Sequence, residues 1–156
     1  MAYLLRERAD APRLDGVRVL VVDDTALVLE VVTEILRGVG AIVTAVGSAR
    51  AALQALRSEP PDVLLSDIAM PGEDGYWLID RVRALPADAG GATAAIALTA
   101  HGGVEDYPLL RAGFQAHLAK PVGMRELVST VAALNRSHRA DRSSVKRHPA
   151  GPLSPR

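Results

Sequence analysis

Residues 17–24, VRVLVVDD, are an almost unbroken run of β-branched and leucine side chains that ends at two aspartates. Such a run is typical of a strand that is covered on both faces, as in a parallel sheet with helices on either side. Similar short apolar runs recur along the chain, each separated from the next by the length of a helix. We expect the other strands at residues 41–46, 62–67, 94–99 and 116–119.

The segments between these runs repeat apolar residues at the spacing of one helix face. In the first segment the repeat runs from Val28 to Val39 and ends among glycines that act as stop signals. We expect the further helices at about residues 48–57, 75–85, 104–112 and 124–134. Five strands that alternate with five helices predict an α/β fold with a doubly wound parallel sheet and right-handed crossovers.

The composition narrows the classes of chemistry that the 156 residues can support. Hydrophobic residues make up 49% of the chain but aromatic residues only 3%, so the core must be aliphatic. The chain has no cysteine, which excludes disulfides, thiol catalysis and thiolate metal sites. No apolar run approaches the ~18 residues of a membrane span, and the first residues do not resemble a signal peptide. We therefore expect a soluble, cytoplasmic protein with no membrane contact.

The charged residues divide the chain into an acidic body and a basic end. Residues 135–156 carry six Lys or Arg and one Asp, which leaves 12 basic and 17 acidic residues in residues 1–134. An acidic body of this kind does not fit a nucleic-acid-binding protein. We expect an N-terminal extension over residues 1–15, one domain over residues 16–134, and a disordered basic tail over residues 135–156.

Polar side chains stand where four of the expected strands end. Asp23 and Asp24 follow the first strand, Asp67 ends the third, Thr99 ends the fourth, and Lys120 follows the fifth. In a doubly wound sheet, functional groups gather at the carboxyl ends of the strands, near the point where the strand order reverses. We expect these five side chains to lie close together, although they are far apart in the sequence.

Three carboxylates at one site cannot all remain ionised without a compensating positive charge. A hard divalent cation with oxygen ligands, Mg²⁺ in particular, would supply that charge, and Lys120 would add to it. A carboxylate nucleophile, a metal, a hydroxyl and an ammonium together suit phosphoryl transfer to an aspartate, a reaction that depends mainly on positioning and charge neutralisation.

Four segments carry a family resemblance: VLVVDD at residues 19–24, DVLLSDIAMPGEDG at 62–75, IALTA at 96–100 and HLAKP at 117–121. In this order they resemble the successive signatures of the receiver domains of two-component response regulators. Any one of them alone is a weak signal, whereas all four at the expected strand ends are specific. The resemblance extends over about residues 17–134 and implies a flavodoxin-like sheet with the strand order 2-1-3-4-5.

The resemblance also implies a set of site residues. Asp67 would be the phosphoacceptor, with Asp24 and Asp67 as direct Mg²⁺ ligands. Asp23 would bind the metal through water, and the backbone carbonyl of Ala69 would complete the ligands that the protein provides. No organic cofactor is implied.

The remaining site residues would bind the phosphoryl group or take part in switching. By the resemblance, Thr99 would donate a hydrogen bond to the phosphoryl group, and Lys120 would form an ion pair with it, ahead of a cis peptide bond to Pro121. Thr99 and the residue three positions before the lysine form the switch of such domains. That residue is usually Tyr or Phe, but here it is His117, and a histidine at this position resembles the receivers of hybrid sensor kinases. We expect His117 either to mark a recognition surface that changes shape little, with the loop from Thr99 to Val104 carrying most of the signal, or to be a passive, half-exposed histidine.

The resemblance implies a phosphorylation-dependent signalling switch and not an enzyme with a substrate of its own. The phosphoryl donor would be a histidine kinase or a histidine phosphotransfer protein. A homodimer through the fourth helix, fifth strand and fifth helix is one further partner option. The 22 residues after Leu134 are too few for a DNA-binding output domain, so the chain is expected to be either a stand-alone regulator or the receiver part of a hybrid histidine kinase.

Simpler explanations and rival functions remain for these residues. Asp23 and Asp24 could cap the first helix, and Asp67 could begin a turn. A flavodoxin-like nucleotide- or flavin-binding protein would need a Gly- or Ser-rich phosphate loop after the first strand, where this chain has two acids. A dehalogenase-like phosphatase would have its nucleophile after the first strand and a second Asp two residues later, but here the two acids are adjacent.

Overall fold

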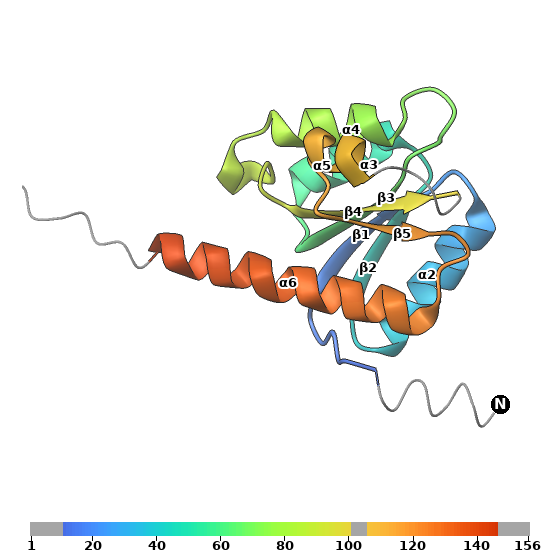
Figure 1. The fold of residues 1–156 in the computed structure, drawn as a ribbon, viewed down its shortest axis with the longest axis horizontal. Coiled ribbons are helices and arrows are strands. Elements are labelled where there is room, and N and C mark those ends of the chain that lie inside the picture. Colours follow the sequence, from blue (N-terminus) through green and yellow to red (C-terminus); the bar gives the residue numbers. More distant parts are fainter. Residues whose placement is uncertain (1–10, 101–105, 147–156) are drawn as a thin grey trace, which may run out of the picture.

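The computed structural model describes residues 11–100 and 106–146. In this part of the chain, five parallel strands form one sheet in the order β2-β1-β3-β4-β5 (Figure 1), as the sequence predicts. The strands are β1 (Arg18–Val22), β2 (Ile42–Val46), β3 (Val63–Asp67), β4 (Ala94–Thr99) and β5 (Ala116–Ala119). The helices are α2 (Ala26–Gly38), α3 (Ala49–Ser58), α4 (Gly75–Arg83), α5 (Asp106–Ala112) and α6 (Met124–Lys146), with a 3-10 turn η1 (Ala87–Ala89).

Helices cover both faces of the sheet, α2 and α6 on one side and α3, α4 and α5 on the other (Figure 1). Successive strand residues point to opposite faces, so β1 serves two cores at once. Val19 and Val21 pack with α2 and α6, whereas Leu20 and Val22 pack with α3 and α4. This is why the strands are continuous apolar runs, as the opening segment predicts.

The register of the sheet aligns the carboxyl ends of its strands. Val22 at the end of β1 pairs with Val46 and with Ser66, one residue before Asp67. At the end of β4, Thr99 pairs with Ala119, one residue before Lys120. All four functional strands therefore end at the same edge of the sheet.

The start of α4 holds the loop after β3 close to the sheet edge. Asp74 caps the helix by accepting a hydrogen bond from the backbone N–H of Trp77 at 2.8 Å. Gly75 follows, and a Cβ at this position would lie 2.4 Å from the carbonyl oxygen of Asp67. Only glycine fits such an approach, so Gly75 allows α4 to begin directly against the end of β3.

The last helix corrects the expectation for the chain's end. The sequence predicts a helix that ends at Leu134 and a disordered tail from residue 135, but α6 continues to Lys146. Residues 135–146 contain neither glycine nor proline, and the first of them still pack on the domain, since Asn135 is buried and His138 half-buried. Charge and polarity alone do not end a helix that has already been nucleated. Residues 147–156 lie outside the described part.

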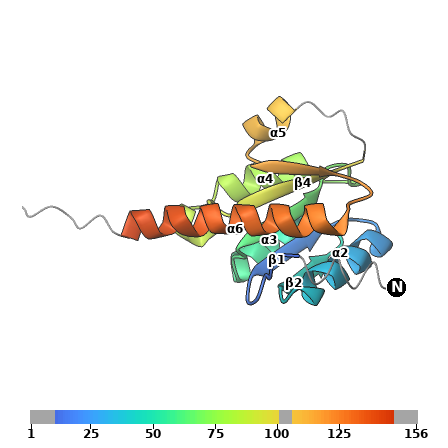
Figure 2. The same cartoon turned by 60° about the horizontal axis from the view of Figure 1, so that its bottom comes forward.

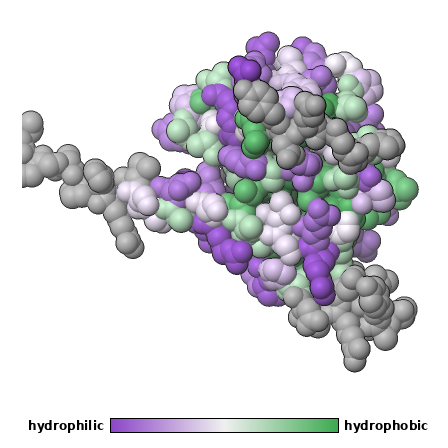
Figure 3. Space-filling model, in the orientation of Figure 1, coloured by the Kyte–Doolittle hydropathy of each residue, from purple (hydrophilic) through white to green (hydrophobic). Residues whose placement is uncertain are grey.

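The distal part of α6 projects past the body in both ribbon views (Figures 1 and 2). Its surface is mainly hydrophilic in the space-filling view (Figure 3). Among the helices in residues 11–100 and 106–146, none has both the length and the apolar character needed to cross a membrane.

Candidate functional site

The carboxyl ends of β1, β3, β4 and β5 bring the predicted site residues together. Asp23 follows β1 and is fully buried, and Asp67, the last residue of β3, is 3% exposed. The buried Thr99 ends β4, and Lys120 directly follows β5. The sheet thus gathers groups from positions almost one hundred residues apart.

Lys120 bridges two of the carboxylates. Its Nζ lies 2.6 Å from Oδ2 of Asp23 and 3.2 Å from Oδ1 of Asp67. The other oxygen of Asp23 accepts a hydrogen bond from the backbone N–H of Thr25 at 2.9 Å. One ammonium is therefore shared between two buried acids, and its position is fixed by both.

The third carboxylate, that of Asp24, is exposed and lies at the rim of the same cluster. One carboxylate oxygen from each of Asp23, Asp24 and Asp67 lies within 4.8 Å of the others. Three carboxylates and one ammonium leave an excess of negative charge. Oδ2 of Asp23 is buried and forms the 2.6 Å ion pair with Lys120, so the ammonium that Asp67 also needs is already held closely by Asp23.

These features fit a hard divalent cation. Mg²⁺ prefers a few carboxylate oxygens together with water, and it offsets charge that one lysine cannot offset alone. The exposed carboxylate of Asp24 leaves one side of the cluster open to solvent, where a hydrated ion and a phosphoryl group could enter.

The protonation states follow from burial and from the neighbouring charges. Burial raises the pKa of Asp67, and the charge of Asp23 raises it further, while Lys120 acts in the opposite direction. Burial alone would lower the pKa of Lys120, but its hydrogen bonds and charge interactions with Asp23 and Asp67 outweigh burial, so that pKa is raised. Lys120 therefore remains an ammonium. Any additional positive charge near Asp67 would stabilise its ionised form.

The hydroxyl of Thr99 is hydrogen-bonded to the neighbouring strand. This buried group donates a hydrogen bond to the backbone carbonyl of Leu118 on β5 at 3.4 Å. The two strand ends are also joined by the backbone N–H of Lys120, which donates to the carbonyl of Thr99 at 2.7 Å. The peptide bond from Lys120 to Pro121 is cis, as the resemblance implies.

The other two residues implied by the resemblance lie nearby. Ala69 is exposed in the loop two residues after Asp67. His117 is exposed on β5, the edge strand, opposite Ala97 of β4. The expected switch loop from Thr99 to Val104 falls mostly on residues 101–104, which lie outside the described residues.

The structure contains two polar networks that sequence reasoning missed. Arg83 binds backbone carbonyls at the amino ends of β4 and β5, including that of Gly113 at 2.7 Å. Near the site, Arg50 of α3 donates to Glu73 in the loop after β3 at 2.7 and 2.9 Å. No motif marks either arginine, because helix-surface arginines are common and only the tertiary fold supplies their partners.

Comparisons with known proteins agree with this geometry. The family model described as the response regulator receiver domain matches residues 19–132. An uncharacterised 14.6 kDa protein of Leptolyngbya boryana is 46% identical over 114 residues, 72% of this chain and 86% of that protein. The sensor histidine kinase GacS of Pseudomonas protegens is 38% identical over 73% of this chain, which spans only 13% of GacS.

Among solved structures, the chain resembles the receiver domain of the sensor histidine kinase PA1611 from Pseudomonas aeruginosa. The TM-score is 0.71 and the identity 30%, over 78% of this chain and 98% of that one. That structure holds a magnesium ion coordinated in the active site cleft.

Proposed function

The chain belongs to the response regulator receiver domain family, and from this premise we propose that it is a phosphorylation-dependent signalling switch whose phosphoacceptor is Asp67. One observation carries the proposal. Lys120 contacts both Asp23 and Asp67, and the carboxylate of Asp24 completes a cluster within 4.8 Å. A buried carboxylate beside an ammonium, in a cluster whose remaining negative charge a divalent cation would offset, suits the capture of a phosphoryl group.

In the proposed step, an oxygen of Asp67 forms a bond to phosphorus while the bond from phosphorus to the donor's histidine nitrogen breaks. Asp67 is the nucleophile in its ionised form. Lys120, which already lies 3.2 Å from Asp67, holds a phosphoryl oxygen by an ion pair once the acyl phosphate has formed. The freed electron pair stays on the donor's imidazole, which needs no acid from this chain.

Mg²⁺ is part of the proposal, as the source of the positive charge that offsets the phosphoryl oxygens. Asp24 and Asp67 would bind it directly, Asp23 through water, and Ala69 through its backbone carbonyl. The fit rests on the excess of carboxylates over the single ammonium, together with the magnesium ion in the cleft of the PA1611 receiver domain.

Switching would begin at Thr99. Its hydroxyl now donates to Leu118, and we propose that it turns toward the phosphoryl group once Asp67 is modified. Burying an imidazole inward would require partners for both of its nitrogens, so His117 would remain outward in both states and mark a recognition surface that changes shape little. The loop from Thr99 to Val104 would then carry most of the signal.

Receiver domains work with histidine kinases or phosphotransfer proteins, and we propose that such a protein is the donor here. The surface beside Asp24 suits docking, because Leu27 and Val31 of α2 are 67% and 46% exposed. Apolar side chains reach the surface over α2 in the space-filling view (Figure 3). A homodimer through α5, β5 and α6 is a further proposed contact, and neither nucleic acid nor a membrane is a proposed partner.

The likeness to GacS supports a second version, in which the chain is the receiver of a hybrid histidine kinase. In both versions the switch acts in the cytoplasm and has no catalytic output of its own, apart from assisting its own phosphorylation and dephosphorylation.

The proposal is tested by incubating the protein with acetyl phosphate and Mg²⁺ and recording its intact mass. Wild type should gain one phosphoryl group that hydroxylamine removes, as expected for an acyl phosphate. Asp67→Asn should gain none, and omission of Mg²⁺ should suppress the reaction. Labelling of Asp67→Asn at the wild-type level would overturn the assignment.

A further inference from the structure

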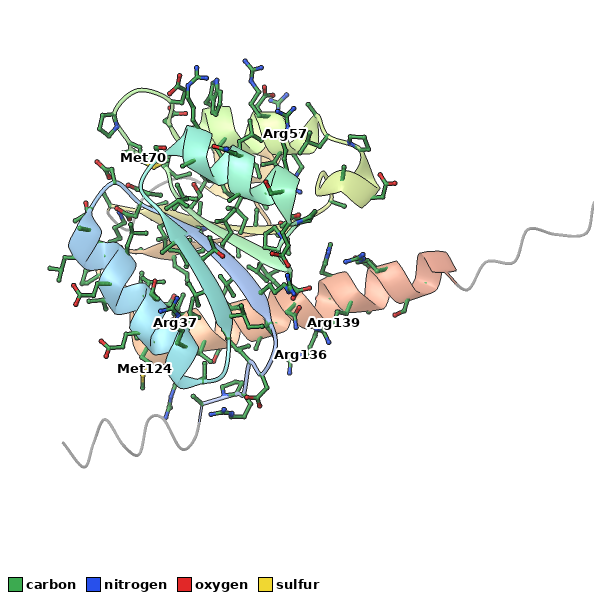
Figure 4. All side chains as sticks on the ribbon, turned by 180° about the vertical axis from the view of Figure 1, so that it is seen from behind. Arg37, Arg57, Met70, Met124, Arg136 and Arg139 are labelled. Carbon is green, nitrogen blue, oxygen red and sulfur yellow. The ribbon has the colours of Figure 1, made fainter. Side chains whose placement is uncertain are left out.

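On the side of the sheet away from α2 and α6, the helices α3 and α4 form a groove of about 390 Å³. Its lining residues are Arg50, Leu53, Gln54, Arg57, Ser58 and Trp77. Figure 4 shows Arg57 on this helical layer, on the opposite side of the molecule from Arg136 and Arg139 of α6. The proposed phosphorylation chemistry uses none of these residues.

The floor of the groove is apolar and its ends are cationic. Leu53 and Trp77 are both half-buried, and Trp77 is the chain's single tryptophan. The guanidiniums of Arg50 and Arg81 each lie 5.3 Å from the centre of its ring, so both are held in place by cation–π contacts. Arg57 is exposed at the other end. Three guanidiniums thus gather on a domain whose residues 1–134 carry more acids than bases.

We propose that this groove docks an acidic amphipathic segment of a partner protein, with two carboxylates on either side of an apolar side chain. The spacing of the arginines indicates the kind of partner. Arg50 and Arg57 are seven residues apart on α3, about 10 Å along the helix axis. To bind both guanidiniums, a single phosphate would have to draw Arg50 away from both Trp77 and Glu73, whereas two acids seven positions apart on a helix match the spacing of the two arginines. The apolar side chain between them would rest on Leu53 and Trp77.

The groove also communicates with the loop after Asp67. Arg50 holds Glu73 of that loop through an ion pair in which the arginine side chain is 70% exposed. Exposed pairs of this kind are weak and readily exchanged. A partner carboxylate would therefore compete with Glu73 for Arg50, and occupation of the groove would release the loop that carries Ala69.

The probe is a capped synthetic helix of about 16 residues with two glutamates seven positions apart and a leucine between them. Its binding to the full chain is measured by the anisotropy of a terminal dye and by the fluorescence of Trp77. We expect saturable binding that weakens at high salt. A peptide with lysines in place of both glutamates should not bind.

Variants locate the binding. Arg57→Glu should weaken it about tenfold, through one lost pair and one new repulsion, and a peptide with lysine at the matching end should restore it. Arg125→Glu, the same change at an exposed position of α6, should have no effect. Glu73→Gln should tighten binding about two- to fivefold by removing the competing carboxylate. Phosphorylation by acetyl phosphate should be unchanged in Arg57→Glu.

Several results would overturn this proposal without touching the assignment of Asp67. They are equal binding of the lysine peptide, equal weakening by Arg125→Glu, and no binding at all. Tighter binding of a single-stranded oligonucleotide that also depends on Arg57 would point to nucleic acid instead. Sedimentation that shows a dimer abolished by Arg57→Glu would make a second copy of the chain the occupant.

Discussion

Two partly buried cations stand at opposite ends of the same sheet, and their surroundings differ. Lys120, at the carboxyl ends of the strands, faces charged carboxylates of Asp23 and Asp67. Within the described residues, the hydrogen-bond acceptors of Arg83, at the amino ends of β4 and β5, are all neutral. These are the carbonyls of Gly113, Gly91 and Thr93 at 2.6–3.1 Å and the side-chain oxygen of Gln115 at 3.3 Å.

The difference separates a structural cation from a functional one. Every nitrogen of the Arg83 guanidinium donates hydrogen bonds, so the cation at that end of the sheet has no donor left for a ligand. At the other end, three carboxylates lie close together and one ammonium is shared between two of them. A saturated site holds the fold together, whereas a site with unbalanced charge can bind a further ion and a phosphoryl group.

The largest effect on stability is expected at Arg83, whose donors are all used; we call this the saturated end of the sheet. Arg83→Met should lower the free energy of unfolding by about 3 kcal/mol, because it leaves several buried carbonyls without a donor. Urea denaturation measures this. Arg125→Met, the same change at an exposed position of α6, is the matched control and should change stability by less than about 0.5 kcal/mol. Equal losses in both variants would remove the structural role of Arg83.

A smaller loss of stability is expected at Lys120, at the end of the sheet where carboxylates outnumber the ammonium; we call this the unbalanced end. Here the stability should also respond to metal. Lys120→Met should cost about 2 kcal/mol without metal, because two buried carboxylates lose their shared cation. Mg²⁺ should stabilise this variant more than wild type, since the ion no longer competes with an ammonium. The same urea experiments with and without Mg²⁺ test this. Mg²⁺ should stabilise Arg83→Met only as much as wild type, and a reversed pattern would contradict the comparison.

The smallest effect concerns pH and the projecting helix. Burial lowers the pKa of His138 below its usual 6.5, and the charges of Arg142 and Arg83 lower it further. The charges of Asp62 and Asp141 raise this pKa but do not outweigh the other effects. The folded state therefore binds this proton less readily than the unfolded state. Stability from this group is complete above pH 6.5 and is lost as the pH falls through the folded pKa.

His138→Gln should make the stability curve flatter below about pH 6.5 and leave it unchanged above that pH. Urea denaturation at a series of pH values measures this. An identical acid dependence in wild type and His138→Gln would show that α6 does not hold this histidine against the domain.

The unbalanced end could be predicted from the sequence, and the saturated end could not. Asp67 and Thr99 end buried apolar runs, and parallel strands bring such ends to one edge, so the shared edge follows from the strand pattern, while the strand order that makes β1 and β3 neighbours was implied by the family resemblance. Arg83 sits on a helix like many other arginines. Its acceptors come from loops before β4 and β5, and only the assembled fold brings them within hydrogen-bond distance.

Two other details show the same limit. The direction of the Thr99 hydroxyl, toward Leu118, is a rotamer choice that depends on tertiary neighbours. The polar, charged composition after Leu134 predicts disorder, but this prediction is wrong for residues 135–146, which belong to α6. In the structure, a run without glycine or proline continues a helix already held by Val131 and Asn135.

The excess of carboxylates over cations at the strand ends is the central claim, and a calorimetric titration with Mg²⁺ tests it most directly. Wild type should bind one ion weakly, and Lys120→Ala should still bind it, because the lysine is no ligand. Asp24→Ala removes the most accessible carboxylate and should abolish binding. Mg²⁺ binding by Asp24→Ala as strong as that of wild type would contradict the metal site and the phosphorylation mechanism built on it.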